Sequence, residues 1–309
     1  MSTVVILGAI NMDCIAFVSR FPREGENLRT LDLKCHPGGR GANQATALAN
    51  LKIAHILLGK VGYDFTGDYV LSVLKGYKIN TEYIWQSQLG KTGICSIIVS
   101  KKGENTILGH PAVNRLIRPD FVSRNKFVFE LGDWFVASLE YPLKTVEAAL
   151  AFARKQGLKT VLDPSPLIDI PGKDFWASID YVLPNQYEIR KITGENELLQ
   201  GAIVLKNWGV KEVIIKQGAL GASFLQQDNL INSPAFTVKT VVDTTGAGDL
   251  FNAAFIYGMI QTESVPKSVQ IANLVASYAV QKKGTGQSYP LRKEIDWEQL
   301  NKRQDTALF

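Results

Sequence analysis

The chain has 309 residues, of which 46% are hydrophobic and 20% are charged, and its formal net charge is +5. These proportions are typical of a globular protein and exclude disordered, collagen-like and coiled-coil classes. The length fits roughly two domains or one large α/β domain. The basic residues are scattered, so we expect no nucleic-acid partner, although a mild positive balance suits an anionic substrate such as a nucleotide.

The three cysteines, Cys14, Cys35 and Cys95, lie far apart and form no Cys-x-x-Cys pair. This spacing indicates neither a disulfide framework nor a thiolate zinc site. The amino terminus lacks the basic segment of a signal peptide, and no apolar run approaches the length of about 18 residues that a membrane span needs. We therefore expect a cytoplasmic protein with no membrane partner.

Short β-rich runs alternate with longer helical patterns along the chain. The predicted strands are 3–10, 55–61, 134–138, 160–163, 181–183 and 213–216. The predicted helices between them are 41–51, 65–75, 143–156, 185–192 and 198–208, and two consecutive helices joined at 263–266 follow between 246 and 283. Strands that alternate with helices are typical of βαβ units and of a parallel sheet covered on both faces.

Two segments break this alternation. Residues 15–36 contain the turn-like Pro22-Arg-Glu-Gly25, and residues 92–108 have the pattern of a hairpin. Strands without crossover helices do not easily join a parallel sheet. We therefore expect a small antiparallel sheet, formed by segments at about 12–37 and 90–110, that stands off the main domain as a lid. No linker is visible, so 1–309 is expected to form a single domain with this lid.

The strongest motif is Asp243-Thr-Thr-Gly246-Ala-Gly-Asp249, which leads directly into an apolar helix. Small residues at a helix start leave backbone N–H groups bare, and with the helix dipole they form a site for an anion such as phosphate. Asp249, at the same helix start, could accept a proton from a hydroxyl that attacks a phosphoryl group. Taken alone, Gly-Ala-Gly-Asp is explained equally well as an ordinary helix cap.

A second glycine-rich motif, Pro37-Gly-Gly-Arg-Gly-Ala-Asn-Gln-Ala45, also opens a predicted helix. It is neither a Walker A loop nor a dinucleotide-binding fingerprint. Gly38, Gly39 and Gly41 would let a ligand approach the backbone closely. Asn43 offers both a donor and an acceptor to a polyol. A helix-entry turn is the alternative explanation.

Together these motifs resemble those of the ribokinase family, the PfkB-type carbohydrate kinases. Residues 243–249 match the family's C-terminal signature letter for letter, and residues 38–45 match its N-terminal one, with Arg40 where ribokinases often have Lys. Weaker matches lie between them in the right order, so the resemblance covers nearly the whole chain. It implies an α/β fold, with a three-layer α/β/α domain built on a mostly parallel sheet and with a small antiparallel β lid.

The resemblance also implies the role of each matching residue. Catalysis would fall to Asp249 as base and to Gly246, Ala247 and Gly248 as anion hole, and the sugar would be bound by Asn11, Asp13, Gly39, Asn43, Glu140 and Asp249. ATP would contact Asn185, Lys216, Gly218, Gly221, Gly248 and Asn273, while Glu188 would help indirectly to hold Mg²⁺. A K⁺ site would use Asp243, Thr245, Ala279, Lys282, Gly284 and Ser288.

The implied activity is transfer of the γ-phosphoryl group of ATP to a sugar hydroxyl, with ribose as the first candidate. A kinase for another sugar, a sugar phosphate or a nucleoside stays open, because lid and pocket residues decide the substrate. A non-catalytic sugar-binding regulator is a further alternative, but an intact Gly246 to Gly248 followed by Asp249 favours an enzyme. The lid also forms the dimer contact in this family, which implies a homodimer.

The position of Asp163 in the sequence has two possible explanations. It ends a predicted parallel strand within Leu-Asp-Pro-Ser-Pro166, at the edge where ligands usually bind. It could line the ATP or Mg²⁺ side of the site, and a turn formed by Asp-Pro explains it equally well.

Overall fold

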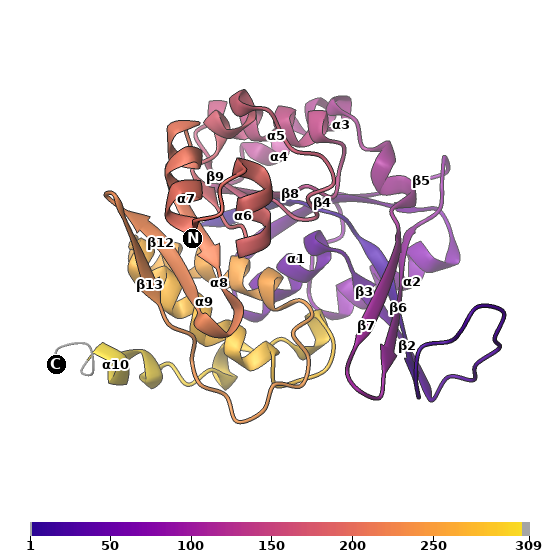
Figure 1. The fold of residues 1–309 in the computed structure, drawn as a ribbon. Coiled ribbons are helices and arrows are strands. Elements are labelled where there is room, and N and C mark those ends of the chain that lie inside the picture. Colours follow the sequence, from indigo (N-terminus) through magenta and orange to yellow (C-terminus); the bar gives the residue numbers. More distant parts are fainter. Residues whose placement is uncertain (1, 305–309) are drawn as a thin grey trace.

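The larger sheet consists mainly of parallel strands, as the alternating pattern predicts. The computed structural model describes residues 2–304, and in them this sheet has the strand order β13-β12-β11-β10-β9-β8-β1-β4-β5 (Figure 1). The pairs from β11 to β5 are parallel, whereas β12 and β13 extend the sheet as an antiparallel hairpin. The strands are β1 (Thr3–Leu7), β4 (Ala54–Gly62), β5 (Ile84–Ser87), β8 (Trp134–Ser138), β9 (Lys159–Asp163), β10 (Tyr181–Val182), β11 (Glu212–Lys216), β12 (Ala222–Gln226) and β13 (Asn229–Ser233).

Two groups of helices cover the two faces of this sheet (Figure 1). One face is covered by α1 (Arg40–Asn50), α2 (Phe65–Gly76), α8 (Ala247–Thr262) and α9 (Val265–Ala279). The other is covered by α3 (Pro119–Arg124), α4 (Lys126–Phe129), α5 (Leu143–Lys155), α6 (Gln186–Thr193) and α7 (Leu198–Asn207), and α10 (Glu298–Gln304) packs on α9. This is the expected three-layer architecture. No helix among residues 2–304 is long and apolar enough to span a membrane.

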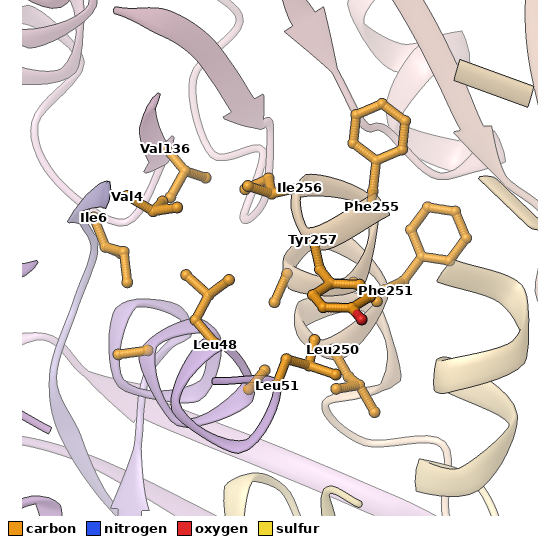
Figure 2. Close-up of a cluster of buried hydrophobic side chains, with 14 of the residues drawn as sticks. Val4, Ile6, Leu48, Leu51, Val136, Leu250, Phe251, Phe255, Ile256 and Tyr257 are labelled. Carbon is orange, nitrogen blue, oxygen red and sulfur yellow. The ribbon is translucent and has the colours of Figure 1, made fainter. Parts of the chain in front are cut away.

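The two cores follow from the alternation of side chains along each strand. In β1, Val4 and Ile6 are buried beneath α1 and α8, whereas Val5 and Leu7 are buried on the opposite face. Figure 2 shows Leu48 of α1 facing the strand residues of the first core. Each such fully buried aliphatic side chain stabilises the fold by about 1.5–3 kcal/mol. Helix α8 is apolar on most of its surface because α1, α9 and the sheet enclose it.

A smaller sheet stands off the large one (Figure 1). Its strands are β2 (Asn11–Val18), β3 (Asp32–Gly38), β6 (Gly93–Ser100) and β7 (Asn105–His110), in the order β3-β2-β6-β7. The outer pairs are antiparallel as expected, but the middle pair, β2–β6, is parallel. A parallel pair needs a long connection, and here the chain passes through the large domain between the two strands.

The predicted strands and helices of the large domain are present, with differences at their ends. The predicted strand 3–10 stops at Leu7, because the chain turns at Gly8 beneath the start of α1; Gly8 would bring a Cβ within 2.6 Å of the Cα of Gly41. The hairpin β12–β13 and the edge strand β5 were not expected from the sequence pattern. All three lie at the margins of the sheet; β5 and β13 are short and mostly exposed or half-buried, which weakens their apolar signal, whereas β12 is mostly buried but only five residues long.

Candidate active site

Two helix N-termini meet at the carboxyl-end edge of the large sheet, where ligands usually bind in such folds. Helix α1 follows Gly39, which has a φ of 85°, and α8 follows Gly246, which has a φ of 75°. Glycine adopts these positive φ values without steric cost, so each one turns the chain sharply into its helix. The two helices pack against each other, which brings the two distant sequence motifs together.

The glycines of the first motif are required by the packing of the chain itself. A Cβ on Gly41 would lie 2.3 Å from the carbonyl oxygen of Gly8, and one on Gly38 would lie 2.0 Å from Cγ of Asp13. The space beside Gly38 and Gly41 is therefore filled by the β1–β2 turn and by Asp13. A Cβ on Gly39 would likewise lie 2.4 Å from the carbonyl oxygen of Ala9, so the structure supplies a packing reason for all three glycines, and close approach of a ligand stays a prediction.

Glu140, which follows β8, holds the start of α1 against the sheet. Its carboxylate accepts hydrogen bonds from the backbone N–H groups of Ala9 (2.9 Å) and Arg40 (3.1 Å), and from the hydroxyl of Ser138 (3.0 Å). Burial raises the pKa of Glu140 above its ordinary value, although the positive charge and the N–H of Arg40 oppose the shift. The predicted sugar-contacting acid thus has a scaffolding role in this structure.

Asp249 is buried, and both of its carboxylate oxygens have partners. Oδ2 accepts a hydrogen bond from Nδ2 of Asn43 (2.8 Å), and Oδ1 accepts one from Nη1 of Arg40 (3.2 Å). Burial raises the pKa of Asp249; Arg40 lowers it and the charge of Asp163 raises it further. A carboxylate with a raised pKa binds a proton more readily, as a general base must.

The start of α8 presents a site for an anion. No side-chain hydrogen bond caps this helix within the described part of the chain. The backbone N–H of Ala247 donates to the carbonyl oxygen of Thr244 (3.2 Å), and the positive end of the helix dipole lies at this start. Nζ of Lys216, at the end of β11, lies 3.8 Å from where a Cβ on Gly248 would stand and donates a hydrogen bond to Oδ1 of Asn252 (3.1 Å). A cation therefore lies beside the helix start.

Asp13 and Asn11 lie on one face of β2, close to the same edge. Burial, with a contribution from the charge of Glu140, raises the pKa of Asp13 to about 7. Its Oδ1 has no hydrogen-bond partner within residues 2–304. Oδ1 of Asn11 accepts a hydrogen bond from Nδ2 of the fully buried Asn114 (2.8 Å). An unpartnered buried carboxylate oxygen is suited to accept a hydrogen bond from a ligand hydroxyl.

The predicted Asn-x-x-Glu motif forms a capping box at the start of α6. The backbone N–H of Asn185 donates to Oε2 of Glu188 (2.8 Å), and the N–H of Glu188 donates to Oδ1 of Asn185 (2.8 Å). Asn185 also forms a parallel bridge with Lys216, so the motif lies at the same sheet edge. Because these atoms already satisfy the helix end, a contact with Mg²⁺ or phosphate stays a prediction.

The remaining predicted nucleotide contacts lie in turns and in α9. Gly218 and Gly221 have φ values of 59° and 93°, and a Cβ on Gly221 would lie 2.2 Å from the carbonyl oxygen of Ser233. Nδ2 of Asn273 donates to that same carbonyl oxygen (2.8 Å). In this structure Asn273 therefore ties α9 to the end of β13, and its contact with a nucleotide stays a prediction.

The residues predicted to hold K⁺ come together from two loops. Asp243 accepts hydrogen bonds from the N–H groups of Thr245 (2.9 Å) and Gly284 (3.0 Å), and the hydroxyl of Ser288 donates to the carbonyl oxygen of Gly284 (2.8 Å). Lys282 donates its N–H to the carbonyl oxygen of Ala279 (3.1 Å). These contacts knit the segment before α8 to the segment after α9.

A hollow of about 800 Å³ lies between the small sheet and these loops. It is lined by Ile15, Phe17 and Ile97 of the small sheet and by the loops 241–245 and 283–287. Asp249 does not line it, although the hollow adjoins the segment that leads into α8. We place the candidate active site at Asp249, because the convergence of polar groups, and not the size of the hollow, determines the chemistry.

Comparison with known proteins places these features in a family. The family model for pfkB family carbohydrate kinases matches residues 1–292. The chain belongs to this family. A ribokinase of Staphylococcus aureus is 32% identical over 300 residues, which are 95% of this chain and 98% of the relative. A deoxyribokinase of Salmonella typhi is 31% identical over 292 residues, or 93% and 95% of the two chains.

The fold agrees with this membership. The structure of an Arabidopsis thaliana ribokinase complexed with ribose and ATP has a TM-score of 0.88 to this pfkB carbohydrate kinase, at 27% identity and with 95% and 97% of the two chains covered. The ribokinase-like architecture expected from the motifs is therefore confirmed.

In this carbohydrate kinase the structure adds residues that the sequence did not assign to the site. Arg40 donates to Oδ2 of Asp163 (2.8 Å) and to the hydroxyl of Ser165 (2.6 Å), both at the end of β9. Asp163 was open to two explanations, and it lies at the site instead of merely forming a turn. Asn252 follows Asp249 by three residues and so lies on the same face of α8; this helical spacing is the one signal that could have found it.

Proposed function

We propose that this pfkB-family chain is an ATP-dependent sugar kinase that transfers the γ-phosphoryl group of ATP to a sugar hydroxyl. The observation that carries the proposal is the position of Asp249. Its carboxylate lies at the uncapped start of α8 and is held by Asn43 of the other motif (2.8 Å). A base and an anion site on the same helix turn are what phosphoryl transfer to a hydroxyl requires.

Asp249 would accept the proton of the sugar hydroxyl as that oxygen attacks the γ-phosphorus. The raised pKa of Asp249 supports this role. The N–H groups at Gly246 and Gly248, and that of Ala247 once it exchanges the carbonyl oxygen of Thr244 for the phosphoryl group, would stabilise the negative charge that builds up on the transferred group. Lys216 beside Gly248 adds a positive charge to the same place.

The sugar would lie between β2 and the two helix starts. Asn11, Asp13, Gly39, Asn43 and Glu140 all lie there, and Asp13 offers an unpartnered oxygen. The small sheet would act as a lid over this pocket. Such a lid excludes water and so limits hydrolysis of ATP in place of sugar phosphorylation.

ATP would be bound along the ends of β10 and β11, by Asn185, Lys216, Gly218, Gly221, Gly248 and Asn273. Within residues 2–304 no three acidic, His or Cys side chains are grouped to hold a metal ion. Mg²⁺ is usually bound through one or two carboxylates together with substrate phosphates. The buried carboxylate of Glu188 fits such an indirect role, and Mg²⁺ would supply further charge neutralisation of the phosphates.

We propose a K⁺ site in the loops that contain Asp243, Thr245, Ala279, Lys282, Gly284 and Ser288. The loops offer carboxylate, hydroxyl and carbonyl oxygens, the donors that suit a hard cation. In addition, the buried Oγ1 of Thr285 lacks a hydrogen-bond partner among the described residues. A cation here would stiffen the segment that leads into Gly246 and thereby the anion site.

A homodimer formed through the small sheet is part of the proposal. One face of this sheet carries Ala16, Leu33, Ile98 and Leu108, as the strand registers show. Leu33 is 60% exposed and Leu108 is 68% exposed, so a second copy would cover an apolar surface. The cytoplasmic location stays a prediction, which the free thiols of Cys14, Cys35 and Cys95 support.

Ribose is the first candidate for the acceptor, and 2-deoxyribose is the next, because a ribokinase and a deoxyribokinase are relatives of similar identity. Arg40 is paired with Asp163 and Asp249. Its charge is already neutralised within the chain, and this favours an uncharged sugar. Other sugars, sugar phosphates and nucleosides are the alternatives, and a non-catalytic regulator is a more distant one.

The test is ADP release from ATP and Mg²⁺ with ribose, 2-deoxyribose, other pentoses, hexoses, hexose phosphates and nucleosides, each in K⁺ and in Na⁺. We expect the highest turnover on ribose, increased by K⁺. Asp249→Asn should lower kcat by about 10²–10⁴-fold, the range for loss of a general base.

The outcomes separate the possibilities. Turnover on another acceptor that Asp249→Asn abolishes would keep the mechanism and replace the substrate. Full activity of the folded Asp249→Asn variant would exclude Asp249 as the base. No turnover on any acceptor, with sugar binding still measurable by calorimetry, would favour the regulator.

A further inference from the structure

One buried carboxylate at the site has no part in the mechanism described above. Asp163 is the last residue of β9, and its side chain is fully buried. In the described part of the chain no backbone N–H donates a hydrogen bond to it. Its neighbours are two cations: Nη1 of Arg40 at 2.8 Å from Oδ2, and Nζ of Lys216 at 3.5 Å from Oδ1.

The same two cations both reach α8. Arg40 pairs with Asp249 (3.2 Å), and Lys216 donates to Asn252 (3.1 Å), one helical turn further on. Two positive groups close to one helix N-terminus repel each other and are repelled by the helix dipole. The negative charge of Asp163 lies between Arg40 and Lys216 and offsets the repulsion between these two cations.

The end of β9 holds Arg40 with a second group as well. Oγ of Ser165 accepts a hydrogen bond from Nη2 of Arg40 (2.6 Å), while Nη1 faces Asp163. The guanidinium plane is therefore fixed at both nitrogens by residues of one strand end. A guanidinium group held in this way keeps its orientation when a third anion binds.

We propose, building on the kinase function above, that the end of β9 is a positioning element for phosphoryl transfer. Asp163, with Ser165, holds Arg40 and Lys216 together at the start of α8, so that both cations are in place when charge develops on the transferred group. In this role Asp163 is a positioning residue and not a catalytic one. It acts through the two cations.

The energetic reason is preorganisation. Cations that are fixed before the reaction stabilise a developing charge without reorganising at that moment. Without Asp163, Arg40 would have Asp249 as its remaining carboxylate partner and would draw closer to it. The base would then lose proton affinity and the phosphoryl group would lose a cation, and both changes slow the chemical step.

Several charged or titratable groups from different elements face Asp249 and act together on its proton affinity. They are Arg40 of α1, Asp163 of β9, Lys216 of β11, Glu140 after β8, Asp13 of β2 and Tyr289 after α9. Asp163 raises the pKa of Asp249, so its removal lowers that pKa. The acid limb of the pH profile of kcat should therefore move to lower pH in an Asp163 variant.

The experiment compares full-length wild type, Asp163→Asn and the matched control Asp180→Asn, a buried Asp just before β10 at the amino-end edge of the same sheet. Turnover is measured with the best acceptor, ATP and Mg²⁺ across pH 4 to 9, with kcat and the sugar KM determined separately. We expect Asp163→Asn to lower kcat at least tenfold and to move the acid limb to lower pH, with the sugar KM within threefold. The control should change none of these three quantities.

Other outcomes overturn the proposal. A folded Asp163→Asn enzyme with unchanged kcat and acid limb, or with a loss confined to KM, shows that Asp163 is only structural. If this variant does not fold, Ser165→Ala decides: a severalfold fall in kcat at unchanged KM supports the positioning role, and an unchanged kcat overturns it. Absence of turnover in wild type overturns the kinase function itself, and this inference with it.

Discussion

The part of the sheet formed by β9, β10 and β11 has an Asp–Lys pair at each end of its strands, and the two pairs differ in what surrounds them. At the carboxyl ends, Asp163 and Lys216 are the last residues of their strands, 3.5 Å apart. At the amino ends, Asp180 and Lys211 lie just before β10 and β11, 2.6 Å apart. The same two residue types thus occur at both edges of one sheet.

The surroundings give the two pairs different roles. Asp180 accepts hydrogen bonds from the backbone N–H (2.8 Å) and the hydroxyl (3.1 Å) of Thr160, and 61% of the Lys211 side chain is exposed. That pair clamps two strands together. Asp163 is instead bound by two cations that also contact α8. A buried carboxylate bonded to the backbone therefore serves the fold, whereas one bonded only to cations that also contact α8 is available to serve chemistry.

The largest expected change in stability comes from Asp13, at the carboxyl-end edge of the sheet. Its pKa of about 7 exceeds the ordinary value of 3.8, so the folded protein binds a proton more tightly than the unfolded chain. The free energy of unfolding should therefore be highest below about pH 4 and should fall as the pH rises to 7, by up to about 4 kcal/mol from this group. Asp13→Asn should remove that dependence in urea unfolding between pH 4 and 8.

The same variant tests the sugar pocket. Loss of a charged acceptor for a sugar hydroxyl should raise the sugar KM about 10–100-fold, with a smaller effect on kcat. A variant whose unfolding free energy has the wild-type pH dependence would show that Asp13 ionises normally. A variant with a wild-type KM would place the sugar elsewhere.

Much of this edge could be predicted from the sequence, because its key features are local. The glycines before α1 and α8 and the acid Asp249 are readable in short motifs, and Asn185-x-x-Glu188 is readable as a capping box. The strands of the central sheet were likewise found, since buried parallel strands are short continuous apolar runs. Local patterns of this kind depend on neighbouring residues alone.

The contacts that distinguish the two edges are not local. Arg40, Asp163 and Lys216 come from three segments, and only the strand order places them together. The sequence left Asp163 undecided because an Asp-Pro turn and a site carboxylate look the same in one strand. The parallel pairing of β2 with β6 was also not predictable, because pairing across a long connection depends on the tertiary fold.

Gly41 and Gly157 lie at the two edges of the sheet, and replacing each by Ala should lower the free energy of unfolding by a different amount. Gly41, at the carboxyl-end edge, would bring a Cβ to 2.3 Å from the carbonyl oxygen of Gly8, whereas Gly157, just before β9 at the other edge, has a φ of 84° but open space around it. Gly41→Ala should lower the free energy of unfolding by about 3 kcal/mol, and Gly157→Ala by about 1 kcal/mol. Guanidinium unfolding measures both, and equal losses would contradict the tighter packing at the site.

Asp180→Asn gives the smallest expected effect and completes the comparison. Burial alone would raise the pKa of Asp180, but the hydrogen bonds from Lys211 and Thr160 lower it below the ordinary value overall. The stabilisation is therefore fully present above about pH 4 and is lost as the pH falls through the folded-state pKa. Because Lys211 is largely exposed and can be rehydrated, the substitution should cost only about 1 kcal/mol at pH 7.

The variant should also lose less stability than wild type as the pH falls below 4, because it lacks the carboxylate whose protonation weakens the fold. Urea unfolding at pH 3 and pH 7 measures this difference, and turnover at pH 7 should equal that of wild type. A fall in kcat would mean that the Asp180–Lys211 pair affects the reaction through β9 or β11. The two edges of the sheet would then be coupled, and the amino-end pair would not have a purely structural role.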